Sequence, residues 1–228
     1  EKPNKIHVYS MSVTAKDTDG DELNGTPSSW SSAIDNILFN NDAKKLFCIS
    51  VGNTDIDDSS FEYKKTNLDS RIENPAQSWN ALSIGAFTQK DTITDEGSIY
   101  VNYDVIMAKK DEISPFTTTS HLWDKQWCIK PDVVFEGGNL LLNTIRNDKT
   151  EHEDLSLLTT HVNIYQDLIT WTFATSAANA LGANFVARLY STFPEATPET
   201  IRGLVVHSAN WTDKMFAQFK GTTNSDRD

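Results

Sequence analysis

The sequence predicts a three-layer α/β fold with a doubly wound, mainly parallel sheet. Strand and helix signals alternate along its 228 residues, as they do in folds of this class. Most strand candidates are continuous apolar runs, which are typical of strands that are buried on both faces. The connection between the first two candidates carries a clear helix, and such crossovers are right-handed in nearly all proteins.

Four segments are predicted to be strands. The first, residues 6–13 (IHVYSMSV), is rich in β-branched residues and precedes an acidic loop. The next two, residues 46–51 (LFCISV) and 81–87 (ALSIGAF), are almost wholly apolar. The fourth covers residues 132–135 and ends at a Gly-Gly pair. These four segments define the expected sheet.

Three segments are predicted to be helices. After Ser-Ser-Trp-Ser-Ser, apolar residues from Trp30 to Leu38 follow the spacing i, i+3, i+4, i+7, i+8, which forms one helical stripe. Residues 176–193 repeat apolar groups every fourth position, and the Ala and Gly residues among them would let this helix approach the sheet closely. A last helix begins with Thr197 as N-cap and Pro198 at its first position. The polar tail after Ala217 is expected to fray.

No domain boundary is evident, so residues 1–228 are interpreted as a single domain. Two stretches between core elements have the character of insertions. Residues 89–113 show an alternation that predicts a hairpin, and residues 143–168 are acidic and helix-prone at their start.

The composition excludes several functions. A net charge of −12 opposes nucleic-acid binding, which requires cationic neutralisation of phosphates. No segment has the roughly 20 apolar residues of a membrane span. The two cysteines are too few for a disulfide framework and favour a reducing, cytoplasmic compartment. Because the chain begins with Glu1 in place of Met, the presence of an upstream targeting segment is left open.

Three ordered blocks of sequence resemble the later part of the catalytic domain of subtilisin-like serine peptidases. The first block is residues 9–13 (YSMSV) followed by residues 50–53 (SVGN). The second comprises residues 74–76, 81–86, 114–117 (SPFT) and 130–134 (KPDVV). The third is residues 174–178 (ATSAA), followed by Gly182, Pro194, residues 197–198 and 201–202, and residues 206–209 (VHSA). Together they cover nearly the whole chain and predict a subtilisin-like fold.

The resemblance implies a serine endopeptidase site with Ser176 as nucleophile and Asn53 as oxyanion donor. A side-chain amide can donate to the oxygen that becomes negative during acyl transfer, and a helix N-terminus supports the same charge. The family comparison also implies which backbone segments flank the first specificity pocket of a peptide or protein substrate: Ser10, Met11, Ser12 and Val13 on one side, and Ser50, Val51 and Gly52 on the other.

The sequence departs from the family in lacking a recognisable catalytic aspartate and histidine. None of the five histidines precedes the Gly-Thr that marks the family's base. We therefore expect an N-terminally truncated domain that lacks its first strands and the Asp and His segments, and an isolated chain close to inactive. The alternative is a pseudopeptidase domain that binds extended peptides without cleaving them. A nucleotide-binding doubly wound domain is disfavoured, since no Gly-x-Gly-x-x-Gly follows the first strand.

The expected absence of the family's first strands also predicts that the chain associates with another polypeptide. A missing upstream strand would leave an open apolar sheet edge, so we expect a dimer or association with an N-terminal fragment through that edge. Local departures are Ala174, where the family usually has glycine, and Glu136, where many members have proline. Residues 136–139 (EGGN) resemble a bacterial subgroup associated with AAA-type ATPases, which suggests such a partner.

No cofactor is expected. Residues 17–21 (DTDGD) are similar to a calcium loop, but the glycine comes one position early and no glutamate closes the site, so we interpret them as a solvated acidic loop.

Overall fold

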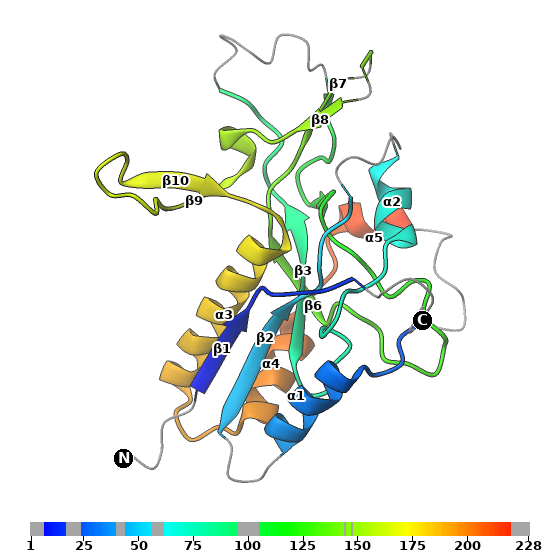
Figure 1. The fold of residues 1–228 in the computed structure, drawn as a ribbon, viewed down its shortest axis with the longest axis vertical. Helices are drawn as coiled ribbons and strands as arrows, with labels where there is room; N and C mark the ends of the chain where they lie inside the picture. Colours follow the sequence, from blue (N-terminus) through cyan, green and yellow to red (C-terminus); the bar gives the residue numbers. More distant parts are fainter. Residues whose placement is uncertain are drawn as a thin grey trace.

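A mainly parallel sheet forms the centre of the computed structural model (Figure 1), which describes residues 7–16, 24–39, 44–55, 62–94, 105–143, 145–146 and 148–219. Strands β1 (His7–Met11), β2 (Lys45–Ser50), β3 (Leu82–Thr88) and β6 (Val133–Glu136) are parallel and lie side by side in that order. Strand β5 (Glu112–Ile113) pairs antiparallel with the end of β3. All four predicted strands are therefore confirmed.

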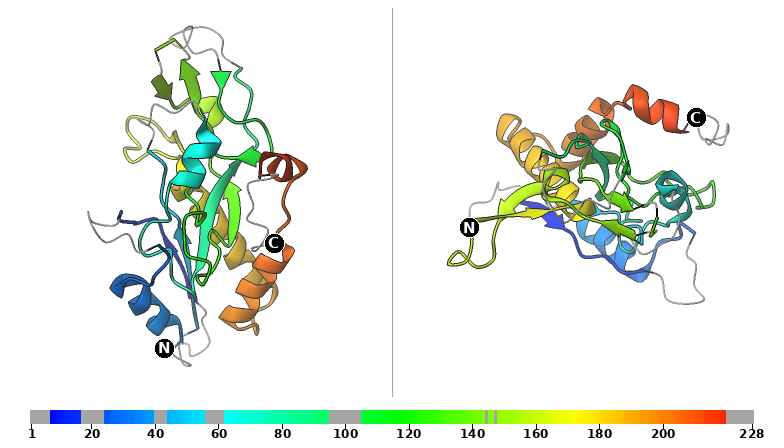
Figure 2. Two further views of the ribbon diagram at one scale, coloured as in Figure 1. Left: turned by 90° about the vertical axis from the view of Figure 1, so that its right-hand side faces the viewer. Right: turned by 90° about the horizontal axis from the view of Figure 1, so that it is seen from above.

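Helices cover both faces of this sheet. Helix α1 (Ser29–Phe39) packs on one face, while α3 (Ala174–Thr192) and α4 (Pro198–Ser208) pack on the other (Figure 2). Side chains of β2 alternate between the two cores, with Leu46 and Cys48 facing α3 and α4, and Ile49 facing α1. This alternation explains the continuous apolar run, and the predicted three-layer α/β fold is confirmed.

Small residues bring α3 close to the sheet. A Cβ atom at Gly182 would collide with the side chain of Ile84 and would lie 3.1 Å from the ring of Phe135. The helix thus depends on glycine at this crossing, as the run of small residues predicts.

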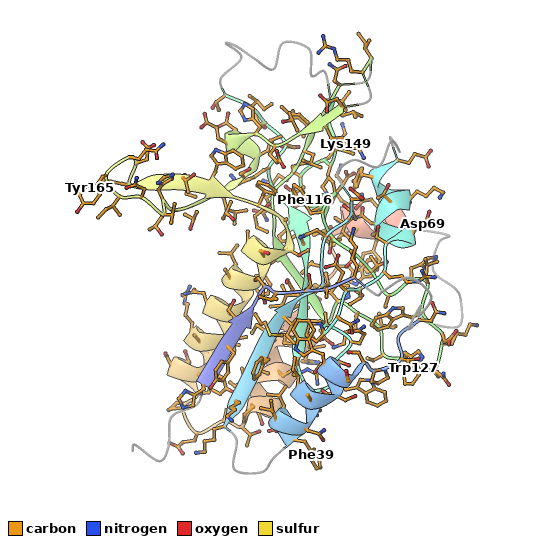
Figure 3. The ribbon with its side chains drawn as sticks, viewed as in Figure 1. Phe39, Asp69, Phe116, Trp127, Lys149 and Tyr165 are labelled. Atoms are coloured by element: carbon orange, nitrogen blue, oxygen red, sulfur yellow. The ribbon has the colours of Figure 1, made fainter. Side chains whose placement is uncertain are left out.

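Outside the central layers, a three-stranded sheet joins β4 (Val105–Ile106), β7 (Leu141–Asn143) and β8 (Asp148–Thr150). Strands β9 (Leu157–Thr160) and β10 (Ile169–Thr172) form an antiparallel hairpin that projects from the body, with Tyr165 at its tip (Figure 3). We call residues 157–172 the arm. It leads directly into α3.

Two short helices were not predicted from the sequence. Helix α2 (Tyr63–Asp69) and helix α5 (Asp213–Phe219) touch each other, because Gln218 donates a hydrogen bond to the Tyr63 hydroxyl at 2.6 Å. The expected fraying after Ala217 is wrong up to Phe219, since α5 buries Met215 and Phe219 and thereby gains apolar burial. Residues beyond 219 lie outside the described part.

One of the two insertions differs from expectation, and most of the hairpin predicted in the other lies outside the described residues. The start of residues 143–168 forms β8 and the one-turn 3-10 helix η1 (Glu153–Leu155) in place of a longer helix, because β8 pairs with β7. In the other insertion, residues 95–104 lie outside the description, and β4 pairs with the distant β7. None of the described helices is long and apolar enough to cross a membrane.

Neither cysteine forms a disulfide. Burial raises the pKa of the Cys48 thiol to about 12, so this group stays protonated at neutral pH and packs as a small apolar side chain. The structure agrees with the interpretation of Cys48 as a core residue.

Candidate active site

The end of β2 meets the start of α3, and the contact between them is Asn53 with Thr175. The side-chain oxygen of Asn53 accepts a hydrogen bond from the backbone N–H of Thr175 at 3.1 Å, and the Thr175 hydroxyl lies 2.8 Å from the same oxygen. That hydroxyl is also 3.0 Å from the carbonyl oxygen of Gly52. Segments 122 residues apart in the sequence therefore converge at one point, as the family resemblance predicts.

These bonds fix the orientation of the Asn53 amide. With its oxygen held by Thr175, the planar amide directs its Nδ2 group to the other side. No described residue accepts a hydrogen bond from this Nδ2, and Asn53 is only half-buried. The amide is thus a pre-oriented donor beside the residue that precedes Ser176.

Ser176 is the third residue of α3 and lies in the turn whose backbone N–H groups have no partner within the helix. The first N–H, of Ala174, donates to the Gly137 carbonyl at 2.7 Å, and the second, of Thr175, donates to Asn53. Among the described residues, neither the N–H nor the hydroxyl of Ser176 has a hydrogen-bond partner. The half-buried serine thus combines a hydroxyl with a donor N–H at a positive helix end.

Ala174 adopts a left-handed backbone conformation with φ of 68°. Glycine takes this conformation freely and alanine does not, which explains the family's glycine at this position in physical terms. The turn is tight on its other side too, since a Cβ atom on Gly137 would lie 3.1 Å from the Ala174 carbonyl oxygen. The start of α3 is thereby held in one position.

The structure explains the presence of Glu136 at a position where many members of the family have proline. Its carboxylate accepts hydrogen bonds from the N–H of Gly138 at 2.7 Å and of Gln89 at 2.6 Å. Asn139, three residues later, donates to the carbonyls of Lys90 and Ala108. Residues 136–139 form a braced turn, and this turn supplies the Gly137 carbonyl that receives the first N–H of α3.

The end of β1 also reaches α3. Nδ2 of Asn179, one turn after Ser176, donates to the hydroxyls of Ser10 and Ser12 at 3.2 and 3.1 Å. Met11 is half-buried in the last position of β1, and the next residues run outward, with Val13 63% exposed. Ser10 and Ser12 are thereby tied to the first turns of α3.

The predicted pocket residues at and just after the end of β2 are all buried. Ser50 is buried, and the Val51 carbonyl accepts hydrogen bonds from the N–H of Glu73 and the hydroxyl of Thr118. Gly52 has a φ of 92°, and a Cβ atom there would collide with the Glu73 side chain. Glu73 in turn accepts a hydrogen bond from the Thr14 hydroxyl. Both predicted flanks therefore border the same helix terminus.

Sequence reasoning missed Thr175, Asn179 and Glu73 as members of this site. Thr175 and Asn179 lie beside the serine in the sequence, but only the folded chain shows that each bonds to a different strand end. Glu73 carries no signal in the sequence, because its contacts to Gly52 and Thr14 are all long-range.

No described residue is placed as a base for Ser176. All five histidines are described, and none forms a hydrogen bond with its hydroxyl. His7 begins β1, His207 lies in the last turn of α4, and His161 lies in the arm, with its ring bonded to Asn163. His121 lies in a turn, and buried His152 accepts a hydrogen bond from the Asp154 N–H. In the described ranges, no group of His, Cys, Asp and Glu could hold a metal ion, and residues 17–21 lie outside them.

A family model described as the Subtilase family matches residues 1–226. A search of the curated proteins found no match.

Proposed function

Because the chain belongs to the subtilase family of serine peptidases, we propose that it is part of an endopeptidase that cleaves peptide bonds through an acyl-enzyme on Ser176. The observation that supports this role most directly is the contact of Asn53 with Thr175, since it brings a free amide donor next to the serine.

In the proposed first step, the Ser176 oxygen attacks the peptide carbonyl while a base takes its proton. Negative charge develops on the former carbonyl oxygen, and the Ser176 N–H together with the Asn53 Nδ2 would donate to it. The proton then passes to the leaving amine, and water repeats the sequence to release the acyl group. The fixed orientation of Asn53 means that little reorganisation is needed as the charge forms.

The base would come from outside residues 1–228. A hydroxyl without an adjacent base is a poor nucleophile at neutral pH, and none of the five histidines forms a hydrogen bond with Ser176. We propose that a histidine, oriented by an aspartate, reaches Ser176 from a polypeptide that completes the domain. The isolated 228-residue chain would then be nearly inactive.

Two exposed features support docking of such a polypeptide. In the described sheet, β1 is an edge strand: His7 donates to the Lys44 carbonyl of the β2 segment, so the N–H groups of Val8 and Ser10 point away from β2. The arm exposes many apolar side chains: Leu158, Val162, Ile164, Tyr165, Leu168, Ile169 and Trp171. An isolated two-stranded hairpin is marginally stable in water, so a covering partner would stabilise it.

We also propose that an extended substrate adds as a strand beside residues 10–13 and 50–52. Backbone groups would hold the peptide in register, and side-chain pockets would provide selectivity. The braced ends of β1 and β2 support this role because their positions are fixed relative to α3.

A fluorophosphonate probe tests the proposal. In the complete product of the gene, the probe is expected to label Ser176 and to leave Ser176→Ala unlabelled, while the 228-residue chain alone reacts far more slowly. Asn53→Ala should lower kcat by about 10²–10³, a figure that comes from a subtilisin itself. Asn210→Ala, at an exposed asparagine after α4, is the matched control and should leave kcat unchanged.

Two results would contradict parts of this scheme. Stoichiometric labelling of the isolated chain at Ser176 would place the base within residues 1–228. If the complete product bound extended peptides but neither cleaved them nor reacted with the probe, the domain would be a pseudopeptidase.

A further inference from the structure

The carboxylate of Glu73 touches both backbone segments that would flank the substrate. On the first side, it accepts a hydrogen bond from the hydroxyl of Thr14, the residue that follows Val13. On the second side, it fills the space beside Gly52, since a Cβ atom built there would lie 2.6 Å from Glu73 Oε2. Gly52 directly precedes Asn53, which is the proposed oxyanion donor. The carboxylate is therefore placed where the side chain of a bound substrate would pass.

Backbone hydrogen bonds fix the position of Glu73. Its N–H donates to the Val51 carbonyl at 3.0 Å, and the next residue, Asn74, exchanges two hydrogen bonds of 2.9 Å with Ala15. The segment that carries the carboxylate is thus bonded both to the chain that continues from β1 and to the end of β2. A side chain on a backbone held in this way can bind a ligand with little ordering cost.

No cation within the described residues pairs with this carboxylate. Glu73 is half-buried, and none of the described lysines, arginines and histidines forms an ion pair with it. The Thr14 hydroxyl is the one described group that donates to its side chain, whereas a carboxylate has about four acceptor sites. Partial removal of a charge from water is unfavourable unless the charge is paired, so a cation bound here would relieve that cost.

A long cationic substrate side chain fits these surroundings better than other types. The flanking residues 10–13 (SMSV) and 50–52 (SVG) carry no charge, so no cation of the flanks competes for Glu73. Lysine and arginine bury an apolar stem and carry their charge at its end. A substrate residue whose carbonyl is held at Asn53 would pass this stem along Gly52 and bring its cation to Glu73. An apolar side chain would cover the carboxylate without pairing it, and an acidic one would be repelled.

On the basis of the peptidase site proposed above, we infer that Glu73 selects substrates with lysine or arginine immediately before the scissile bond. Its carboxylate forms an ion pair with the substrate cation, while Asn53 and the Ser176 N–H hold the carbonyl oxygen of the same substrate residue. Glu73 thereby sets the choice of substrate and takes no part in the proton transfers.

Cleavage of a matched substrate series by the complete product of the gene tests this inference. The substrates are tetrapeptide anilides that differ only in the residue before the anilide: lysine, arginine, norleucine or glutamate. Norleucine has the length of the lysine stem without the charge. We expect kcat/KM for lysine and arginine to exceed that for norleucine by about 10-fold or more, and glutamate to be cleaved most slowly. The ratio of lysine to arginine identifies the cation that the pocket prefers.

Glu73→Gln is the decisive variant. Glutamine has nearly the same shape and can still accept the hydrogen bond from Thr14, so kcat/KM for norleucine should stay within about 2-fold of the parent value while the preference for lysine is lost. Glu195→Gln removes the same charge from an exposed site between α3 and α4 and should keep the preference. This control separates pairing with Glu73 from general attraction of cations by a chain of net charge −12.

Binding provides a readout that does not depend on cleavage. Calorimetry on the Ser176→Ala form of the complete product should show peptide acids that end in lysine binding about 10-fold more tightly than those that end in norleucine, and Glu73→Gln should abolish the difference. Loss of labelling by the fluorophosphonate probe with this preference retained would refute the peptidase function alone.

Two results would overturn the selection by Glu73 and leave the proposed peptidase function intact. The first is equal kcat/KM, or equal affinity, for lysine and norleucine in an enzyme that reacts with the probe. The second is a parallel loss of activity on every substrate in Glu73→Gln, which would show that Glu73 only braces the chain around Thr14 and Gly52.

Discussion

At the residue scale, Ala174 controls the position of the serine. Its left-handed conformation turns the chain from the arm into α3, and its N–H is fixed by the Gly137 carbonyl. The side chain is buried against Phe116 and Leu140. Alanine at this φ carries strain of about 1–2 kcal/mol, which the surrounding contacts offset.

We expect Ala174→Gly and Ala174→Val to differ sharply in stability. Glycine relieves the strain but loses a buried methyl group and gains unfolded-state entropy, so the free energy of unfolding should change by less than about 1 kcal/mol. Valine is β-branched and cannot adopt this φ without a shift of the turn, which should cost about 2 kcal/mol or more. Urea denaturation measures both. Equal stability of the two variants would show that the left-handed conformation is not required.

At the scale of elements, Asp132 joins β3, β6 and α4. Its carboxylate accepts hydrogen bonds from the N–H and hydroxyl of Ser83 and pairs with Lys130 and Arg202. Burial raises the pKa of Asp132, but the two cations and the hydrogen bonds outweigh burial, so the pKa lies below its usual value.

The lowered pKa of Asp132 in the folded protein makes the stability depend on pH. Because the folded pKa is lower than the unfolded value of about 3.9, the stabilisation by Asp132 is complete above that value and is lost as pH falls toward the folded pKa. Asp132→Asn should therefore lower the free energy of unfolding near pH 7 by about 3 kcal/mol and flatten its decline below about pH 4. Denaturation at several pH values measures this.

Asp69→Asn is the control for Asp132→Asn. Asp69 forms an exposed pair with Lys65 on α2, and its loss should change stability by less than about 0.5 kcal/mol. A similar effect of both substitutions would contradict the role assigned to the buried carboxylate.

At the scale of the whole molecule, the β1 edge, which runs beside α3, exposes backbone donors, and the arm, which leads into the N-terminal end of α3, exposes apolar side chains (Figure 1). Such surfaces favour association with another chain. In the absence of a completing polypeptide, a second copy of this chain is the available partner.

We expect sedimentation velocity to show dimers of the isolated chain at concentrations of about 10–100 μM. Leu158→Lys combined with Tyr165→Lys should shift the chain toward monomer, because both side chains are more than 80% exposed on the arm. Ile145→Lys, at a site 92% exposed on the β7–β8 turn, should leave association unchanged. A monodisperse monomer in which the amides of Val8 and Ser10 resist hydrogen exchange would contradict this prediction.

The local signals in the sequence were sufficient for the central layers. Apolar runs and a helical stripe determined the four parallel strands and the helices around them, because burial on both faces leaves a strong pattern in the chain. Helix α5 and the strands β7 and β8 were not foreseen. Their stability comes from distant partners such as Tyr63 and β4, which leave no periodic signal in short segments.

By itself, the sequence determined the fold class, the family resemblance and the serine and asparagine as candidates. Only the tertiary structure decided that Thr175 ties Asn53 to α3, that Asn179 ties β1 to it, and that no histidine of this chain forms a hydrogen bond with Ser176. The reason is physical. Burial of a strand or helix produces a regular pattern of apolar residues within one short segment, whereas the geometry of this site depends on hydrogen bonds between segments more than 100 residues apart.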